Sequence, residues 1–341
     1  MAVNEAAKRK DQSRPFRARL VRDSAASATM ESITKRCGGE AMLETLNTVG
    51  PFDFVKMLQR PLSRPSKLVV IEMERGSYTR ALRLGTRVVP VTVTSAGTVD
   101  EPALLLTYPD DATENERAET IQSVQRMFST EVNLNGFYTK MADLSEWNGL
   151  LKRLYGLRPM QDADLFESMV KVIIGQQLNV QFAATLVERL VDLAGETVDW
   201  EGGLLPVFPS PSRVADWSYD DLRRLSFSQR KAEYVIDFAR AVVNGQVHLD
   251  GLYGMSSGEI YDVLMRFRGV GRWTVECFLL FGMGRTDEMP AADIGVQNAI
   301  HRLYGMAKRP TEDEVRALAE PWMPWRSYAT YYLWQSLIDA N

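Results

Sequence analysis

Two short segments of the chain combine residue types and spacings that can bind and act on a ligand. Residues 267–271 read Phe-Arg-Gly-Val-Gly and lie between two apolar runs with helical spacing. Two glycines around one apolar residue allow a sharp turn and leave backbone amides uncovered at the start of the second run, which is a phosphate-binding geometry. Further along, a loop presents a lone carboxylate, Asp293, at the start of a third helical pattern. A carboxylate in that position can face whatever the bound phosphate anchors.

The segment of residues 264–297, which holds both features, resembles the helix-hairpin-helix and Gly/Pro-Asp signature of the DNA base-excision glycosylases. Further segments resemble the AlkA branch of this superfamily, the 3-methyladenine DNA glycosylase II enzymes, and occur in the expected order. They are residues 78–85, 166–177, 208–211 with 228–232, and 322–329. The resemblance spans about residues 50–341. Several ordered segments are a more specific signal than a single glycine hairpin.

Asp293 is the residue that the resemblance identifies as catalytic. Breaking an N-glycosidic bond builds positive charge on the sugar, and a fixed carboxylate in a dry pocket stabilises that charge and orients the attacking water. The alternative is an ordinary N-cap for a helix that begins near Ile294. The two roles are compatible, because a capping bond also fixes the side-chain rotamer.

Two tryptophans and a cysteine are predicted to line the base pocket. Trp273 stands where the resemblance to bifunctional glycosylase/lyases would place a Schiff-base lysine, so it implies a monofunctional enzyme that uses water. Trp334 matches a second pocket tryptophan, whose ring would attract the positive charge of an alkylated purine and stack on the flipped base. Core packing is the alternative for both rings. Cys277 replaces a pocket tyrosine of the branch's best-known member, which leaves the substrate range open.

The remaining site residues are expected to contact the DNA. The resemblance implies that the amides near Gly269, Val270 and Gly271, together with the Arg272 side chain, hold one phosphate. Gln177 matches the side chain that related enzymes insert into the gap left by the flipped base. A turn glutamine in solvent is the alternative for that residue.

Metal and cofactor binding is restricted by composition. The carbonyl groups of Met265, Phe267 and Val270 resemble a set that binds a monovalent cation in such hairpins, and no cofactor beyond this cation is expected. The chain has few ligands for other metals. Its cysteines and histidines are Cys37, Cys277, His248 and His301. This set argues against a four-cysteine iron–sulfur cluster, a zinc site and a disulfide framework.

The overall composition sets further limits. With 341 residues, of which 45% are hydrophobic, the chain is long enough for two domains with real cores. It lacks both an apolar run of roughly 18 residues and an apolar N-terminal signal, so a membrane span and secretion are not expected. A cytoplasmic, nucleoid-associated location is the prediction. The net charge of −4 argues against a protein that coats DNA nonspecifically, but it permits a small, shaped DNA site.

The elements that must position these residues follow from periodicity. Short β-branched or aromatic runs at residues 68–71, 78–84, 87–93 and 104–108 predict an antiparallel sheet, closed by a helix that includes residues 121–128. After Asn135 the spacing is helical to the end. Helix N-caps with a reciprocal acid three residues later are predicted as follows: Asp164 with Glu167, Ser218 with Asp221, Ser256 with Glu259, and Thr311 with Glu314.

These patterns predict an α+β fold, with a small N-terminal antiparallel β-sheet domain followed by an all-α helix-hairpin-helix glycosylase domain. The sheet domain is expected at residues 51–135 and the helical domain at residues 136–341. Residues 1–50 are expected to be a basic, disordered tail, with an electrostatic arm that speeds DNA binding as the alternative.

The resemblance implies a monofunctional base-excision-repair enzyme. It would act as a monomer on double-stranded DNA with alkylated bases of the 3-methyladenine and 7-methylguanine type. It would hydrolyse the N-glycosidic bond and leave an abasic site. Two alternatives remain: a glycosylase of the same fold for mismatched or oxidised bases, and a non-catalytic protein that uses the hairpin only to bind DNA.

Overall fold

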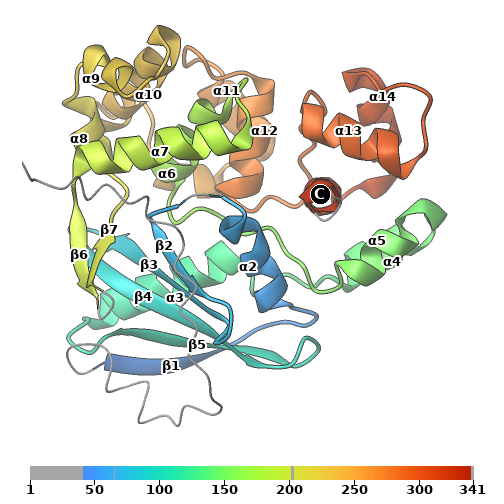
Figure 1. Cartoon of the computed structure of the whole chain (residues 1–341), viewed down its shortest axis with the longest axis horizontal. Coiled ribbons are helices and arrows are strands. Elements are labelled where there is room, and N and C mark those ends of the chain that lie inside the picture. The colour runs from blue at the N-terminus through green and yellow to red at the C-terminus, as the bar shows by residue number, and fades with distance from the viewer. Residues whose placement is uncertain (1–40, 65, 201–202, 339–341) are drawn as a thin grey trace, which may run out of the picture.

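The N-terminal part of the molecule is built on a five-stranded antiparallel sheet, as the strand pattern predicts. The computed structural model describes residues 41–64, 66–200 and 203–338 (Figure 1). The strand order is β1-β5-β4-β3-β2, so the two strands farthest apart in sequence, β1 and β5, are neighbours. The strands are β1 (Ala41–Asn47), β2 (Val69–Glu72), β3 (Ser77–Leu84), β4 (Arg87–Gly97) and β5 (Pro102–Pro109).

Strand β1 corrects the predicted disordered tail of residues 1–50. Residues 1–40 lie outside the described part of the chain, but residues 41–47 form an edge strand along β5, with Met42 opposite Tyr108. The Tyr108 hydroxyl donates a hydrogen bond of 2.9 Å to Glu44. Sequence patterning missed this strand because only one of its seven residues, Leu46, is buried, so the period-two signal is weak.

Both faces of the sheet are covered. Helix α3 (Glu114–Phe128) begins at Thr113 with a capping box and packs Val124, Met127 and Phe128 on one face. A small hairpin of β6 (Thr197–Trp200) and β7 (Gly203–Pro206) lies against the other face, where Leu205 meets Ala81. This hairpin contradicts the prediction that the chain is helical from Asn135 to the end. Because β3 is covered on both sides, nearly all its residues are buried.

The described residues form two large hydrophobic cores, and these divide the molecule differently from the predicted boundary at residue 135. One core joins the sheet to helices from both ends of the helical region. We call this part the sheet lobe (residues 41–160 and 289–338). The other core lies within residues 165–284, which we call the hairpin lobe, and also takes in Leu68. The chain therefore leaves the sheet lobe, builds the hairpin lobe and returns, as the colours of Figure 1 show.

The remaining elements follow this division. None of the helices in the described part of the chain is long and apolar enough to cross a membrane. The sheet lobe contains α2 (Phe54–Leu62), α4 (Asn135–Ala142), η1 (Ser145–Trp147), α5 (Asn148–Arg153), α13 (Ile294–Leu303), α14 (Glu312–Ala319), η3 (Glu320–Trp322) and α15 (Arg326–Ile338). The hairpin lobe contains α6 (Leu165–Gly175), α7 (Val180–Ala194), α8 (Pro211–Ala215), α9 (Tyr219–Arg224), α10 (Gln229–Val243), η2 (Asp250–Gly254), α11 (Ser257–Leu264) and α12 (Arg272–Phe281).

Three of the four predicted capping boxes are confirmed, and only one of the two predicted bonds of the fourth is present. The boxes at Ser218, Ser256 and Thr311 have both reciprocal bonds. Asp164 accepts from the Glu167 amide at 2.8 Å, as predicted, but the Glu167 carboxylate turns away from the cap. It pairs instead with Arg80 of β3 at 2.7 Å and with Lys171. Burial in the contact between the lobes makes this pairing necessary, because an unpaired buried carboxylate is costly.

Candidate active site

Asp293 caps α13 and is also held by both predicted pocket tryptophans. Its Oδ1 accepts from the Val296 amide at 2.9 Å and from the indole N–H of Trp334 at 2.9 Å. Its Oδ2 accepts from the indole N–H of Trp273 at 3.2 Å. Both expectations for Asp293 are therefore compatible with one geometry: the capping bond and the two indoles fix the rotamer of a half-buried carboxylate.

The carboxylate lies where the two lobes meet. Asp293 and Trp334 belong to the sheet lobe, through α13 and α15, whereas Trp273 is on α12 of the hairpin lobe. Gly295 makes the approach possible: a Cβ added there would lie 2.9 Å from Asp293 Oδ1 and 3.2 Å from the Trp334 ring. Sequence analysis missed the need for this glycine, although a glycine within the first turn of a helix is a signal of close approach.

The two hairpin glycines are required for different reasons. Gly269 has φ +86°, and a Cβ there would lie 2.2 Å from the Tyr234 ring, so only glycine fits. Gly271 has φ −106°, and a Cβ there would meet nothing within 4 Å among the described atoms. The fold therefore does not demand the second glycine. Its openness suits the close approach of a ligand to the amides at the start of α12, a helix that has no side-chain cap among the described residues.

The other predicted hairpin residues are near this turn. Val270 is buried beneath it. The side chain of Arg272 is 61% exposed and donates from Nε to Glu276 at 3.1 Å. A guanidinium that is paired on one side and open on the other can still reach a phosphate.

Gln177 lies at the tip of an exposed turn between α6 and α7, with φ +55°. This left-handed conformation is uncommon for a residue other than glycine and concentrates at functional sites. The turn is tied to the hairpin by Gln176, whose amide donates to the Gly269 carbonyl at 2.7 Å and to Thr274 Oγ1 at 2.9 Å. Sequence analysis did not assign this connecting role to Gln176.

Lys231 anchors the same turn from below. Its Nζ donates to the carbonyls of Ile173 at 3.0 Å and Gln176 at 2.6 Å, at the C-terminal end of α6. Burial lowers the pKa of Lys231 to about 8. Lys231, the lysine in the matched motif, therefore holds the turn in place. It has no contact with Asp293 in the described part of the chain.

The predicted base pocket is only partly open in this structure. Trp273 and Trp334 are half-buried, and Trp334 stacks on Phe281 with ring centres 5.4 Å apart and planes 14° from parallel. Cys277 is buried, and burial raises the pKa of its thiol. The cysteine is therefore a small, buried, neutral group near enough to Asp293 and Arg60 for their charges to act on it. Arg60 of α2, which sequence analysis did not consider, also contacts this aromatic cluster.

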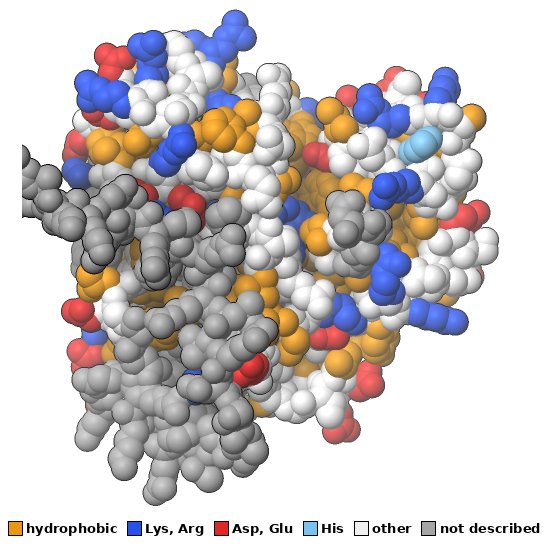
Figure 2. All heavy atoms as spheres, in the orientation of Figure 1, with side chains coloured by type: hydrophobic (Ala, Val, Ile, Leu, Met, Phe, Trp, Pro, Cys, Tyr) orange, Lys and Arg blue, Asp and Glu red, His pale blue; other side chains and the backbone are white. Residues whose placement is uncertain are grey.

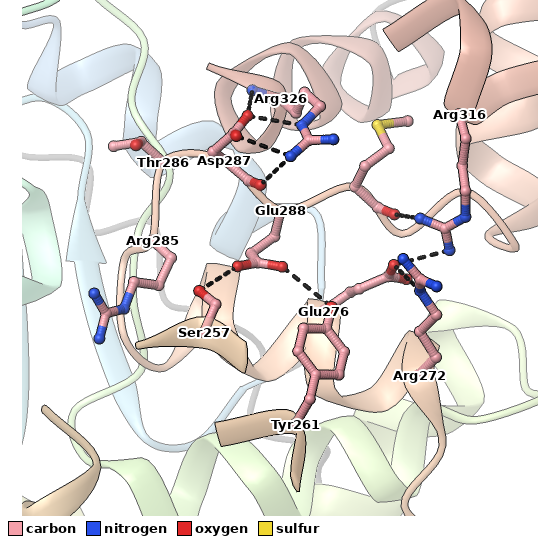
Figure 3. A pocket seen from close by; sticks show the side chains of 11 residues that line it. Ser257, Tyr261, Arg272, Glu276, Arg285, Thr286, Asp287, Glu288, Arg316 and Arg326 are labelled. Atoms are coloured by element: carbon pink, nitrogen blue, oxygen red, sulfur yellow. Dashed lines mark hydrogen bonds and ion pairs between the residues drawn. The ribbon is translucent and has the colours of Figure 1, made fainter. Parts of the chain in front are cut away.

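A separate polar cavity of about 380 Å³ is lined in part by residues 285–289, which lead to Asp293 (Figure 3). Its lining includes neither Asp293 nor either pocket tryptophan. Carboxylates and arginines pair across it: Arg326 donates to Asp287 at 2.7 Å. Ser257 and Tyr261 donate to Glu288 at 2.7 Å and 3.1 Å. These bonds hold residues 287–288 from both lobes.

Arg316 extends this support to the residues that lead to Asp293. It donates to the Met289 carbonyl at 3.2 Å and to the buried Glu276 at 2.9 Å. Burial raises the pKa of both Glu276 and Glu288. The cavity therefore contains the network that fixes the loop before Asp293, and it is not the base pocket.

The surface around the junction is hollowed and partly basic. In Figure 2, hydrophobic side chains line a depression between the positions of α12 and α13 in Figure 1, and several Lys and Arg side chains lie beside it. An apolar hollow with basic groups at its rim can receive a base while the rim contacts phosphates.

Comparisons with known proteins find a matching family and similar chains. A family described as HhH-GPD superfamily base excision DNA repair protein matches residues 170–324. YfjP of Bacillus subtilis (strain 168) is 34% identical over 296 residues, which are 86% of this chain and 99% of YfjP. The 3-methyladenine DNA-glycosylase from Archaeoglobus fulgidus superimposes with a TM-score of 0.75 at 25% identity, over 87% of this chain and 98% of that one. The Schizosaccharomyces pombe 3-methyladenine DNA glycosylase Mag1, solved with abasic DNA, superimposes with a TM-score of 0.52 at 28% identity. That match covers 59% of this chain and 96% of Mag1.

Proposed function

Since the chain belongs to the HhH-GPD superfamily of base excision DNA repair proteins, we propose that it is an AlkA-type DNA glycosylase that removes alkylated bases. The observation that carries this proposal is the carboxylate of Asp293, held by two indoles at the lobe junction beside a glycine hairpin. A protein that only bound DNA would have no use for a carboxylate held in this way. The solved relatives named as 3-methyladenine glycosylases support the same reaction class.

The reaction is hydrolysis of the bond between C1′ of the deoxyribose and the base nitrogen. As the bond breaks, its electron pair leaves with the base and positive charge grows on the sugar. Asp293 stabilises this charge. Water then adds to C1′ and loses a proton, for which the same carboxylate is the nearest acceptor. The products are a free base and an abasic site.

Trp273 makes the proposed reaction monofunctional. A glycosylase/lyase needs an unprotonated amine aimed at C1′, and an indole N–H is a donor with no nucleophilic lone pair. Trp273 instead donates its N–H to Asp293. By the resemblance to the glycosylase/lyases, the indole stands at the position of their attacking lysine.

We assign the DNA contacts to the glycine hairpin and to the turn between α6 and α7. The open amides that follow Gly271, with Arg272 beside them, bind one backbone phosphate. Gln177, exposed on its left-handed turn, inserts into the duplex where the base has left. The hydrogen bonds of Gln176 to the hairpin keep these two contacts at a fixed separation.

A monovalent cation at the hairpin remains part of the proposal. The carbonyl oxygens of Met265, Phe267 and Val270 are the ligand type that hard cations prefer. The Phe267 oxygen already accepts a hydrogen bond of 3.0 Å from the Val270 amide, so a cation would share that oxygen. We propose that the enzyme is a monomer and that it works in the cytoplasm, associated with the nucleoid.

One assay tests the function and its monofunctional character together. Methylated duplex is incubated with the enzyme, and each sample is divided into one part for alkali and one for borohydride. Released bases should be matched by strand breaks that appear only after alkali, and the borohydride sample should contain only free protein. A trapped adduct would mean that a lysine reaches the sugar. Absence of base release would refute the glycosylase assignment.

A further inference from the structure

Arg60, near the end of α2, places its guanidinium among the rings of the candidate base pocket. Its Cζ lies 4.8 Å from the ring centre of Tyr331, 5.3 Å from that of Trp334 and 5.5 Å from that of Phe281. The residue is only 9% exposed. Trp334 in turn donates to Asp293, so a single ring connects the guanidinium to the catalytic carboxylate.

This buried cation has aromatic faces around it but lacks a polar partner for one of its donors. Nη1 of Arg60 is buried and makes no hydrogen bond in the described part of the molecule. No carboxylate among the described residues lies within ion-pair distance of the guanidinium. Burial lowers the pKa of Arg60, while the hydroxyl of Tyr331 and the carboxylate of Asp293 oppose that effect.

An unpartnered donor in such a place points to a ligand. Buried donors in folded proteins are almost always hydrogen-bonded, and leaving one unpaired destabilises the fold. The guanidinium groups of the other two buried arginines of the sheet lobe have oxygen partners for their Nη donors, although Nε of Arg158 is also buried without one among the described residues. Arg80 pairs with Glu167, and Arg158 donates to backbone carbonyls that include Pro51 at 3.0 Å. Arg60 alone among these three depends only on rings.

We propose that Arg60 selects among the bases that enter the pocket, by donating from Nη1 to an acceptor atom on the base edge and by repelling bases that are cationic. The inference rests on the proposed function, because it assigns a role within the glycosylase pocket. Hypoxanthine satisfies both conditions, since it is neutral and offers O6 and N7 as acceptors. 7-Methylguanine in DNA offers O6, but its N7 is blocked by the methyl group and the ring carries a positive charge.

The charge preference follows from what the rings already contact. The faces of Trp334 and Tyr331 would attract a cationic base, but the guanidinium of Arg60 already lies over these rings. Two like charges in a site with little water repel each other strongly. A neutral base with an acceptor edge meets no such repulsion and pairs the Nη1 donor.

The test is single-turnover excision by the full chain from two duplexes that differ only in one base, 7-methylguanine or hypoxanthine. Arg60→Met removes both charge and donor, so the ratio of the 7-methylguanine rate to the hypoxanthine rate should rise by about tenfold or more, the factor that one lost buried hydrogen bond gives. Arg60→Gln keeps an N–H donor without the charge, so it should retain more hypoxanthine activity than Arg60→Met. Thermal melting confirms that each variant is folded.

Lys56→Met is the control, because Lys56 lies one helical turn earlier on α2 and its ammonium group pairs with Asp53 and the Tyr155 carbonyl, neither of which belongs to the aromatic cluster. It should change the rate ratio far less than Arg60→Met. Equal gains on both bases in Arg60→Met would show that Arg60 merely fills the pocket, and equal losses that it merely packs the rings; either result overturns the proposal. Wild-type enzyme that releases 7-methylguanine but not hypoxanthine would also overturn it. Release of neither base by the wild type would instead refute the glycosylase function itself.

Discussion

At the residue scale, the candidate site depends on one carboxylate with two roles, the observed helix cap and the proposed part in catalysis. Asp293 caps α13 through the Val296 amide and faces the lobe junction between two indoles. The capping bond uses Oδ1, while Oδ2 accepts only the longer bond from Trp273. Because the structural and chemical jobs use the same side chain, variants must be chosen that remove one and keep the other.

Asp293→Asn should separate the capping role of Asp293 from its proposed catalytic role. Asparagine is as good an N-cap as aspartate, so the melting temperature should stay close to that of the wild type. The negative charge is lost, so single-turnover base release should fall by roughly 10²–10⁴-fold, the usual effect of removing one electrostatic group. DNA affinity should change little. A fall of less than about tenfold would reduce Asp293 to a helix cap.

Trp273→Phe and Trp334→Phe should each impair catalysis without opening the core. Phenylalanine keeps an aromatic ring but cannot donate to Asp293, and hydrogen bonds to charged groups contribute about 1.5–3 kcal/mol. We expect each variant to lose about tenfold or more in single-turnover rate while the melting temperature changes little. The double variant reports whether the indoles act independently. Rates equal to the wild type would show that the indoles do not hold the carboxylate for catalysis.

At the element scale, one turn and one hairpin form the unit that we propose faces the DNA. The α6–α7 turn and the α11–α12 hairpin are joined through Gln176, and Lys231 supports the turn from α10. Each tip carries a residue that the fold does not need: Gly271 faces open space, and Gln177 adopts a left-handed conformation. Such residues are expected to contribute to binding and not to stability.

The hairpin glycines provide a matched pair of variants. Gly269→Ala should destabilise the protein, because its Cβ would collide with the Tyr234 ring and φ is +86°. Gly271→Ala should leave the melting temperature nearly unchanged but weaken binding to duplex DNA, because only a ligand approaches that position. Thermal unfolding and equilibrium DNA binding measure the two effects. Similar behaviour of the two variants would contradict the assignment of separate roles.

Gln177 can be tested against glycine as well as alanine. Gln177→Gly accommodates the positive φ at no steric cost, so the stability should be equal or greater, whereas the inserted side chain is lost. Both variants should bind duplex with an abasic analogue more weakly, relative to plain duplex, by the equivalent of about 1–2 kcal/mol. Equal losses on both DNAs would make Gln177 an ordinary surface residue.

At the scale of the whole molecule, the candidate active site depends on how the two lobes are held together, because residues of both lobes meet at Asp293. Arg80 of the sheet lobe and Glu167 of the hairpin lobe form a buried ion pair of 2.7 Å, with Lys171 on the other side of the carboxylate. Burial alone would raise the pKa of Glu167, but Arg80 and Lys171 outweigh it and hold the pKa well below its usual range. The pair therefore couples the lobe contact to the protonation of one group.

Glu167→Gln should destabilise the protein by about 3–5 kcal/mol, because Arg80 is left buried without its anion. The pH dependence should change too. Since the folded-state pKa of Glu167 is lowered, its contribution is fully present above the unfolded-state value of about 4.3 and is lost as the pH falls toward the folded-state value. Below pH 4.3 the stability of the wild type should thus fall more steeply than that of Glu167→Gln. Parallel curves would show that the ion pair does not connect the lobes energetically.

The amino-acid sequence by itself determined the elements and the chemical inventory. Turn residues between β-branched runs predicted four of the five strands of the main sheet but not the β6–β7 hairpin. The predicted capping residues located four helix starts, and local spacing indicated the glycine hairpin and a carboxylate at Asp293. These features depend on neighbours within a few residues, so their signals are local. β1 was missed because it gains its stability from β5, more than fifty residues away in sequence.

The tertiary structure alone decided which distant residues meet. Nothing local indicates that Trp273 and Trp334 both donate to Asp293, that Glu167 leaves its cap for Arg80, or that Arg60 enters the aromatic cluster. Each of these contacts joins residues from different elements, and two of them, Trp273 with Asp293 and Glu167 with Arg80, join different lobes. Burial then makes the pairing of polar groups obligatory, and only the packed structure shows which partner each group finds, and that Arg60 Nη1 finds none among the described residues.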